Sequence, residues 1–161
     1  MGNCSGTGTY HCHHQELTMP QFELINAGTH NDFVDQVFDF NENILALPRQ
    51  KEIGLLSPQE LEYAVKAAKE EMQEFFEAHE KQDVIGAVDA VVDLLYFGVG
   101  FLKRLGLTRE QVSQAMAAVH HCNMTKKLST NVTKRVEGVA DATKPEGWVG
   151  PEDRIAEILG G

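Results

Sequence analysis

The sequence has little of what disulfide-linked, membrane-bound or secreted proteins need. Its three cysteines, Cys4, Cys12 and Cys122, are an odd number without regular spacing, which indicates free thiols in a reducing compartment. We find no apolar run that approaches the roughly 20 residues of a membrane span. The N-terminus also lacks the basic start and apolar stretch of a signal peptide. We therefore expect a cytoplasmic protein that does not bind a membrane.

Positive charge is scarce as well. The 161 residues include 24 acidic and 14 basic side chains, the formal net charge is −10, and no run of Lys and Arg exceeds two residues. Nucleic-acid binding depends on a basic surface, so we expect no nucleic-acid partner. A small anion held through a metal ion remains compatible with this charge.

Strand patterns and internal repeats are missing from the sequence, whereas apolar residues recur at helical spacing. A first helix is expected over residues 31–45. A second begins after Ser57, because Pro58 suits the first helical position and Glu60 completes a capping box. This second helix is acidic and runs to about Lys81.

The third helix, residues 83–105, is apolar nearly all the way round, which is typical of a helix surrounded by other protein. Gly106 is expected to close it as a C-terminal cap. Thr108 and Gln111 form a second capping box and open a fourth helix. Residues 128–150 contain Thr, Gly and Pro without a period and predict a loop.

Four helices with short connections predict an all-α fold, an antiparallel four-helix bundle. Two of these helices are too apolar to be covered by two neighbours, so we expect a homodimer or a higher homo-oligomer to complete the bundle. Residues 1–18 are rich in Gly, Ser, Thr and His and are expected to form a disordered leader. Residues 19–161 then form one helical domain.

Four acids stand out on the second and third helices: Glu71, Glu74, Asp89 and Asp93. In helical projection, Glu71 and Glu74 lie at the edge of the apolar stripe and point toward packing. Asp89 and Asp93 interrupt the apolar third helix one turn apart, and Arg104 is the only base near that face. An unpaired carboxylate is costly to remove from water. The acids therefore predict a site for a hard divalent cation, Mg²⁺ or Mn²⁺.

Four short motifs, in order along the chain, resemble those of one enzyme family. Residues 70–74 (EEMQE) resemble an E-E-x-x-E motif, and residues 93–96 read DLLY. Residues 119–126 (VHHCNMTK) are similar to V-H-x-x-N-x-(S/T)-K, and residues 144–148 read KPEGW. Together they resemble the MazG-like all-α nucleoside triphosphate pyrophosphohydrolases over roughly residues 31–159.

This resemblance implies hydrolysis of a nucleoside triphosphate, (d)NTP, to the monophosphate and pyrophosphate with Mg²⁺ or Mn²⁺, in nucleotide-pool house-cleaning. It implies metal ligands at Glu71, Glu74, Asp89 and Asp93. Glu70, Glu71 and Glu74 are the expected catalytic acids, with Glu70 either a ligand or the general base. Many relatives have Glu-x-x-Asp on the third helix, whereas here the acid stands four residues before Asp93, which bears on how many metal ions are held.

Substrate contacts are expected from the two later motifs. Asn123 and Lys126, with Lys127 as a helper, would contact phosphate or sugar. Lys144 and Trp148 belong to the expected substrate-binding set, and Trp148 would either stack on a base or cover the pocket.

Three other interpretations stay open. A phosphoribosyl-ATP pyrophosphohydrolase of histidine synthesis shares the helical fold and the metal chemistry. A carboxylate-bridged di-iron or metal-storage bundle needs Glu-x-x-His on two helices, but Phe76 stands three residues before His79. A helical interaction protein whose acids merely face solvent would explain Glu62, Glu77 and Glu80. It explains Asp89 and Asp93 less well, because they interrupt an apolar helix.

Overall fold

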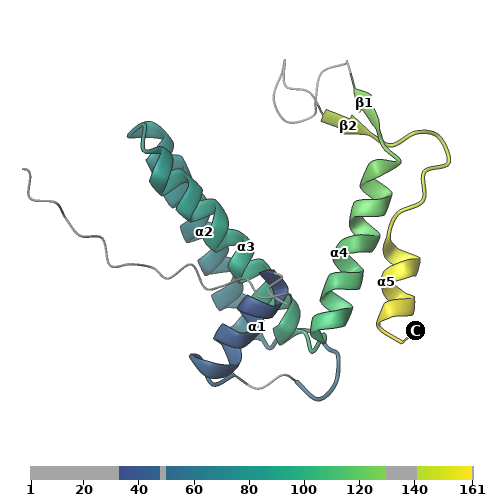
Figure 1. Ribbon diagram of the computed structural model, residues 1–161, viewed down its shortest axis with the longest axis horizontal. Coiled ribbons are helices and arrows are strands. Elements are labelled where there is room, and N and C mark those ends of the chain that lie inside the picture. Colours follow the sequence, from purple (N-terminus) through teal and green to yellow (C-terminus); the bar gives the residue numbers. More distant parts are fainter. Residues whose placement is uncertain (1–32, 48–49, 130–140, 161) are drawn as a thin grey trace, which may run out of the picture. The chain divides into compact units, whose positions relative to one another are not determined.

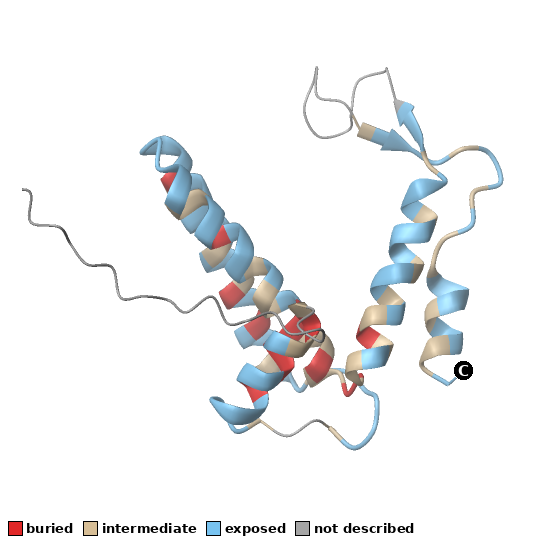
Figure 2. Ribbon diagram, viewed as in Figure 1, coloured by how far each residue is buried: buried red, intermediate tan, exposed pale blue. Residues whose placement is uncertain are grey.

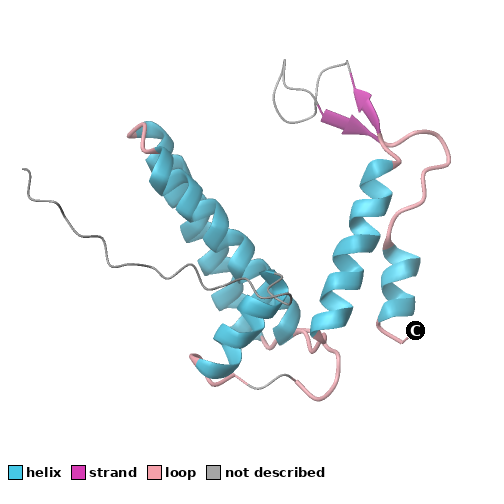
Figure 3. Cartoon of the chain, viewed as in Figure 1, coloured by secondary structure: helices cyan, strands magenta, loops and turns pink. Residues whose placement is uncertain are grey.

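The computed structural model describes residues 33–47, 50–129 and 141–160, all within one unit of the chain, Asn31–Gly161 (Figure 1). The predicted leader, residues 1–18, lies outside the described residues. The described elements, in chain order, are α1 (Phe33–Asn43), α2 (Pro58–Glu80), α3 (Val84–Arg104), α4 (Arg109–Met124), β1 (Lys127–Ser129), β2 (Asp141–Thr143) and α5 (Glu152–Ile158). The predicted all-α helical class is confirmed, with one small hairpin added to it (Figure 3).

Both predicted capping boxes are confirmed. At the start of α2, the Ser57 hydroxyl accepts a hydrogen bond from the Glu60 backbone N–H at 3.3 Å, and the Glu60 carboxylate accepts one from the Ser57 N–H at 3.2 Å. At the start of α4, Thr108 and Gln111 exchange the same pair of bonds at 3.0 and 3.1 Å. Each box satisfies backbone N–H groups that a helix start leaves without partners.

The end of α3 depends on Gly106, as predicted. Its φ of +93° is a left-handed conformation, and its N–H donates to the Lys103 carbonyl at 2.9 Å. A Cβ at this position would lie 2.5 Å from the Glu52 carbonyl oxygen. Only glycine avoids both the backbone strain and this collision.

Helices α2 and α3 pack against each other as a hairpin of two helices (Figure 1). A connection of three residues joins them, and the Asp83 carboxylate caps α3 by accepting from the Gly86 N–H at 3.0 Å. Four of the buried residues of the pair are alanines: Ala64, Ala67 and Ala78 on α2 and Ala90 on α3. Small side chains at the contact allow the two helix axes to approach closely.

The largest buried cluster joins α1 to α3 and α4. It consists of six apolar residues: Val34, Val37, Phe38, Val99, Leu107 and Val112. Arg109, at the start of α4, adds ion pairs to three acids of α1: Asp35 at 3.3 Å, Asp39 at 2.8 Å and Glu42 at 3.0 Å. Core packing and this charge group together fix α1 against α4.

The described residues do not surround α3, so the expectation that it is a fully enclosed helix is wrong for this part of the chain. Only 17% of its most apolar window is buried, and Val84 and Ile85 are 74% and 84% exposed (Figure 2). By length and composition, α3 is also the one helix of the described residues that would suit a membrane span, contrary to the sequence expectation. Core helices of soluble proteins meet the same criteria, and Asp89 and Asp93 would each cost roughly 2.5–3.5 kcal/mol near the centre of a bilayer.

The predicted loop over residues 128–150 contains regular structure, since it includes β2 and most of β1. Strands β1 and β2 pair antiparallel, with Lys127 opposite Thr143 and Leu128 opposite Ala142. Strands of three residues are too short to show an alternating pattern in the sequence, which explains why the prediction missed them.

Candidate active site

The α2–α3 contact determines where the acids lie. Along α2, the buried alanines at 64, 67 and 78 share one stripe with Glu71, since these positions follow steps of three, four and seven residues. Glu71 is half-buried, and its Oε2 atom is buried without a hydrogen-bond partner among the described residues. A carboxylate oxygen therefore occupies a packing position, as the sequence predicts for this residue.

Other acids surround Glu71. Burial raises the pKa of the Glu71 carboxyl, and the negative charges of four neighbours raise it further, in the order Glu74, Asp93, Asp89 and Glu70. Two helices thus contribute carboxylates to one cluster, which we call the acid cluster. It contains all five acids that the sequence analysis selected.

Exposure within the acid cluster differs from the prediction. Glu74, Asp89 and Asp93 are exposed in the chain, so the expectation that they lie out of water is wrong for these three. The reason is the uncovered surface of α3, because the described residues do not surround that helix as expected.

The acid cluster has no basic partner in the part of the chain that the structure describes. Among the described residues, none of its five carboxylates has a Lys, Arg or His partner within ion-pair distance. Arg104, the only base expected near this face, lies 3.7 Å from the Glu60 carboxylate and 5.2 Å from the centre of the Tyr63 ring. The repulsion among the acids is therefore uncompensated.

The acid cluster suits a hard divalent cation by the type of its ligands. Carboxylate oxygens are what Mg²⁺ and Mn²⁺ prefer, and a cation would give the buried Glu71 oxygen the partner it lacks. In their present positions the side chains do not form a ligand shell: within the ranges described, no three His, Cys, Asp or Glu groups lie close enough to hold a metal ion. Metal binding would require some of these side chains to turn.

Tyr96, three residues after Asp93 in the DLLY motif, belongs to the packing beside the acids. Its ring contacts Phe33 and Phe40 edge-on, and its hydroxyl donates to the Gln36 carbonyl at 3.4 Å. Burial raises its pKa, followed by the charges of Asp39 and Asp93. Tyr96 therefore packs against the core beside the acid cluster, with its hydroxyl group satisfied.

The predicted substrate-binding residues form a second group at the end of α4. The Trp148 indole N–H donates to the Cys122 carbonyl at 3.1 Å and to the Thr125 hydroxyl at 3.0 Å. The ammonium groups of Lys144 and Lys126 lie 4.4 and 5.5 Å from the centre of the Trp148 ring. The structure thus brings together three of the five residues predicted to bind substrate.

The other two, Asn123 and Lys127, adjoin this group in sequence. Asn123 is exposed in the last turn of α4, and its carbonyl accepts from the Lys126 N–H at 3.1 Å. Lys127 is exposed at the start of β1. In the described part of the chain, no hydrogen bond, ion pair or ring contact joins these residues to the acid cluster.

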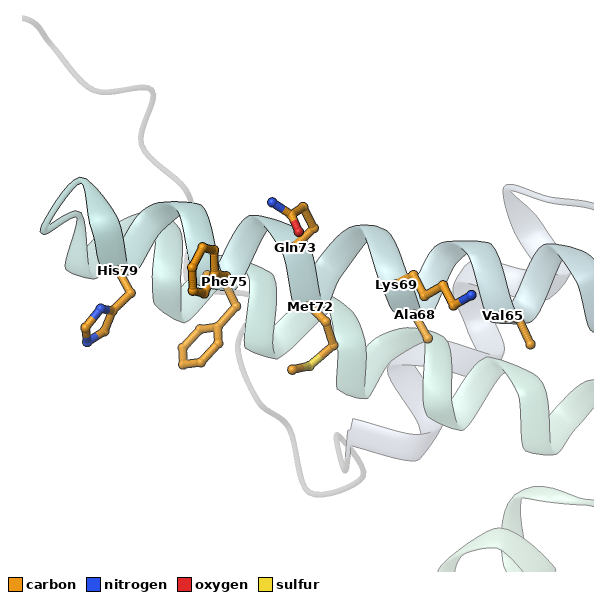
Figure 4. Close-up of a pocket in the computed structure, with 8 residues that line it drawn as sticks. Val65, Ala68, Lys69, Met72, Gln73, Phe75 and His79 are labelled. Atoms are coloured by element: carbon orange, nitrogen blue, oxygen red, sulfur yellow. The ribbon is translucent and has the colours of Figure 1, made fainter. Parts of the chain in front are cut away.

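A groove of about 920 Å³ runs along another face of α2. It is lined by eight residues: Val65, Ala68, Lys69, Met72, Gln73, Phe75, Phe76 and His79. Figure 4 shows Val65, Ala68 and Met72 on one side of the helix and Gln73 on the other. Val65, Ala68, Met72 and Phe75 share one apolar stripe in helical projection, which would be expected to face the core, and the described residues leave this stripe open to the groove.

The comparison with protein families gives a match. The family model described as phosphoribosyl-ATP pyrophosphohydrolase matches residues 39–120. The matched segment contains the whole acid cluster and ends before Lys126, Lys144 and Trp148. The comparison with curated proteins finds no match.

Proposed function

Because the chain belongs to the phosphoribosyl-ATP pyrophosphohydrolase family, within the MazG-like all-α nucleoside triphosphate pyrophosphohydrolase superfamily, we propose that it hydrolyses (d)NTP to (d)NMP and pyrophosphate. Family membership supports pyrophosphohydrolase activity on nucleotides. The observation that carries the proposal is the buried, unpartnered oxygen of Glu71 among four further acids, all inside the matched segment.

We assign the metal ligands to Glu71, Glu74, Asp89 and Asp93, and the metal to Mg²⁺ with Mn²⁺ as a substitute. When bound, such an ion would polarise the attacked phosphorus and make water a better nucleophile. A carboxylate whose pKa is raised accepts a proton more readily near neutral pH, so Glu71 can take the proton of the attacking water if it does not bind metal. Glu70, exposed beside it, is the alternative base.

The choice of (d)NTP over phosphoribosyl-ATP rests on the residues beyond the matched segment. The VHHCNMTK and KPEGW motifs resemble those of enzymes that remove unwanted nucleotides, which supports a role in house-cleaning of the nucleotide pool. Phosphoribosyl-ATP remains the second candidate because the matching family carries that description.

A second copy of the chain is the proposed cover for the exposed apolar faces of α2 and α3. Met72 and Phe76 on α2 are 52% and 56% exposed, and Val88 on α3 is 58% exposed. Two such helix hairpins have the composition of one four-helix bundle.

Light scattering at micromolar concentration should give twice the chain mass or more, and Met72→Glu should reduce the measured mass toward that of one chain. A single-chain mass for the unaltered protein would reject the homodimer.

The test of activity compares substrates and one variant. Purified protein is incubated with each common NTP, each dNTP and phosphoribosyl-ATP, with Mg²⁺ or with EDTA, and pyrophosphate release is measured with added pyrophosphatase. We expect Mg²⁺-dependent release from at least one (d)NTP and loss of at least about 100-fold in Asp93→Asn. Glu80→Gln, an exposed acid at the end of the same helix hairpin, is the matched control. Unchanged turnover in Asp93→Asn would contradict the site.

A further inference from the structure

Helices α2 and α3 each carry an exposed stripe with the spacing of a coiled-coil seam. Steps of four and three residues alternate along both stripes, a repeat that keeps one side of a helix against a partner helix. The stripe consists of Leu61, Val65, Ala68, Met72, Phe75 and His79 on α2, and of Val84, Val88, Val91, Leu95 and Gly98 on α3. All of these residues are exposed except Ala68, which is half-buried. We call the two stripes together the heptad face.

The heptad face lies on the opposite side of the helix hairpin from the acid cluster. In projection along α2, Glu74 falls on one side of the buried alanines and Met72 falls on the other. Along α3, Asp89 falls on one side of the buried Ala90 and Val91 falls on the other. The acids of both helices interact within one cluster, so their two sides of the hairpin coincide. The two stripes therefore share the remaining side.

Two small residues lie at nearly the same level of the heptad face. A Cβ built on Gly86 would lie 3.4 Å from the Ala78 Cβ, which sets the level of α3 against α2. Ten residues back from Ala78 lead to Ala68, and twelve residues on from Gly86 lead to Gly98. With a rise of about 1.5 Å per residue, the two levels differ by about 3 Å.

Gly98 leaves open space on this side of α3. A Cβ built on it would have no atom of the described residues within 4 Å outside its own helix. Glycine inside a helix lowers helix stability relative to alanine, and nothing in the described part of the chain requires it here. Close approach of a second helix does require a small residue.

The charge of the chain indicates what covers this face. Two copies with a net charge of −10 each repel one another, and none of the eleven residues of the heptad face is Asp, Glu, Lys or Arg. Contact through this face leaves both acid clusters on the outside of the pair. A membrane surface suits it less well, because helices that bind membranes carry Lys and Arg on their polar side, whereas the other side of this hairpin is acidic.

We propose that a second copy of the chain docks on the heptad face, with its own helix hairpin packed on this one and the closest approach at Ala68 and Gly98. The inference rests on the proposed homodimer and adds which side of the hairpin is covered. Stripes with heptad spacing suit each other, because the side chains of one helix enter the spaces between those of its partner. The acid cluster stays open to solvent and to a nucleotide in the assembled protein.

The first experiment adds bulk at the point of closest approach. Gly98→Leu meets open space in the single chain and improves helix propensity, so circular dichroism should show a folded helical protein. Between two close helices the added side chain does not fit. Light scattering over a dilution series should show the dissociation constant of the dimer raised at least about tenfold. Ala117→Leu, at an exposed position of α4, is the matched control and should leave that constant within about threefold. An unchanged constant in Gly98→Leu would overturn the close approach.

The second experiment measures which side of the hairpin is covered. In a background without the three native cysteines, one cysteine is introduced on the heptad face as Val91→Cys or on the acid side as Glu70→Cys, and its reaction with a maleimide is timed. Val91→Cys should react at least about tenfold more slowly in the dimer than after dissociation by Met72→Glu, because a thiol inside an interface reacts only when the interface opens. Glu70→Cys should react at the same rate in both. Protection of Glu70→Cys, or rapid reaction of Val91→Cys in the dimer, would overturn the inference.

Failure of this inference is distinguishable from failure of the proposed function. A dimer in which Val91→Cys reacts rapidly keeps the homodimer and rejects the heptad face as its interface. A single-chain mass for the unaltered protein rejects both, and binding of that single chain to phosphatidylcholine vesicles would identify a membrane as the occupant instead. Hydrolysis is measured separately by pyrophosphate release. A dimer with Val91→Cys protected and no nucleotide hydrolysed would leave the interface standing and reject the enzyme activity.

Discussion

Glu71→Gln should stabilise the protein in the absence of metal. The substitution keeps the size of the side chain and removes one negative charge from a cluster in which four other carboxylates raise its pKa. A like-charged pair on a helical surface costs roughly 0.3 kcal/mol. Relief of four such pairs gives about 1 kcal/mol. For a chain of this length, that free energy corresponds to a rise in Tm of roughly 2–4 °C.

The dependence of this gain on pH has a definite sign. Because the pKa of Glu71 is raised in the folded chain, the folded state holds its proton to higher pH than the unfolded state does. The free energy of unfolding of the unaltered protein therefore falls as pH rises through the raised pKa, and this loss is absent below the ordinary pKa of 4.5. The Tm difference between variant and unaltered protein should be present at pH 7–8 and vanish near pH 4.

The assay is thermal unfolding followed by circular dichroism in EDTA, from pH 4 to pH 8. Glu80→Gln is the control, because it removes the same charge from an exposed position of α2 and should change Tm by less than about 1 °C. Added Mg²⁺ should raise the Tm of the unaltered protein more than that of Glu71→Gln, since metal binding stabilises the folded state. Equal Tm values for both proteins at pH 8 in EDTA would refute the electrostatic reasoning.

Three further changes test the fold itself by chemical denaturation. Phe38→Ala, at a side chain that is 2% exposed in the central cluster, should cost about 3–5 kcal/mol of unfolding free energy; a loss below about 1 kcal/mol would mean that this cluster is not a packed core. Ser57→Ala should cost about 1 kcal/mol because the first turn of α2 loses its cap, with Ser113→Ala, inside α4, as the comparison. Gly106→Ala should cost at least about 1–3 kcal/mol, since it combines a positive φ with a Cβ beside the Glu52 carbonyl, and a neutral result would contradict the turn.

The helices were predictable because interactions between residues close in sequence determine where each one begins or ends. Ser57 with Glu60, Thr108 with Gln111, and Gly106 each specify a helix end through bonds to residues within a few positions, so a single sequence is enough to find them. The hairpin of β1 and β2 was missed for the opposite reason. Its two strands are short and separated by more than ten residues.

The grouping of the acids was predictable from the sequence, and their surroundings were less so. Helical spacing placed Glu71 on the stripe of Ala64, Ala67 and Ala78, and the structure confirms that position. Periodicity does not reveal which of two apolar faces a neighbour covers, however. Helical spacing alone also predicts that Val65 and Met72 face the core, whereas α3 packs on the alanine stripe and leaves those two residues exposed.

The role of Trp148 depended on contacts that no local pattern contains. Its partners Cys122 and Thr125 lie more than twenty residues earlier, and the intervening chain has no regular period. The motif identified the residue, but only the arrangement of Lys126 and Lys144 around the ring indicated that it holds cations.

The direct succession of α2 and α3 along the chain affects how the protein is made. Their contacts join segments that are close in sequence, so this hairpin is expected to form early, before α4 has left the ribosome. At that stage the exposed apolar faces of the hairpin can contact other nascent chains on the same messenger RNA. Assembly of the homodimer during translation would then compete with aggregation. Slow synthesis at reduced temperature should therefore increase the yield of soluble protein.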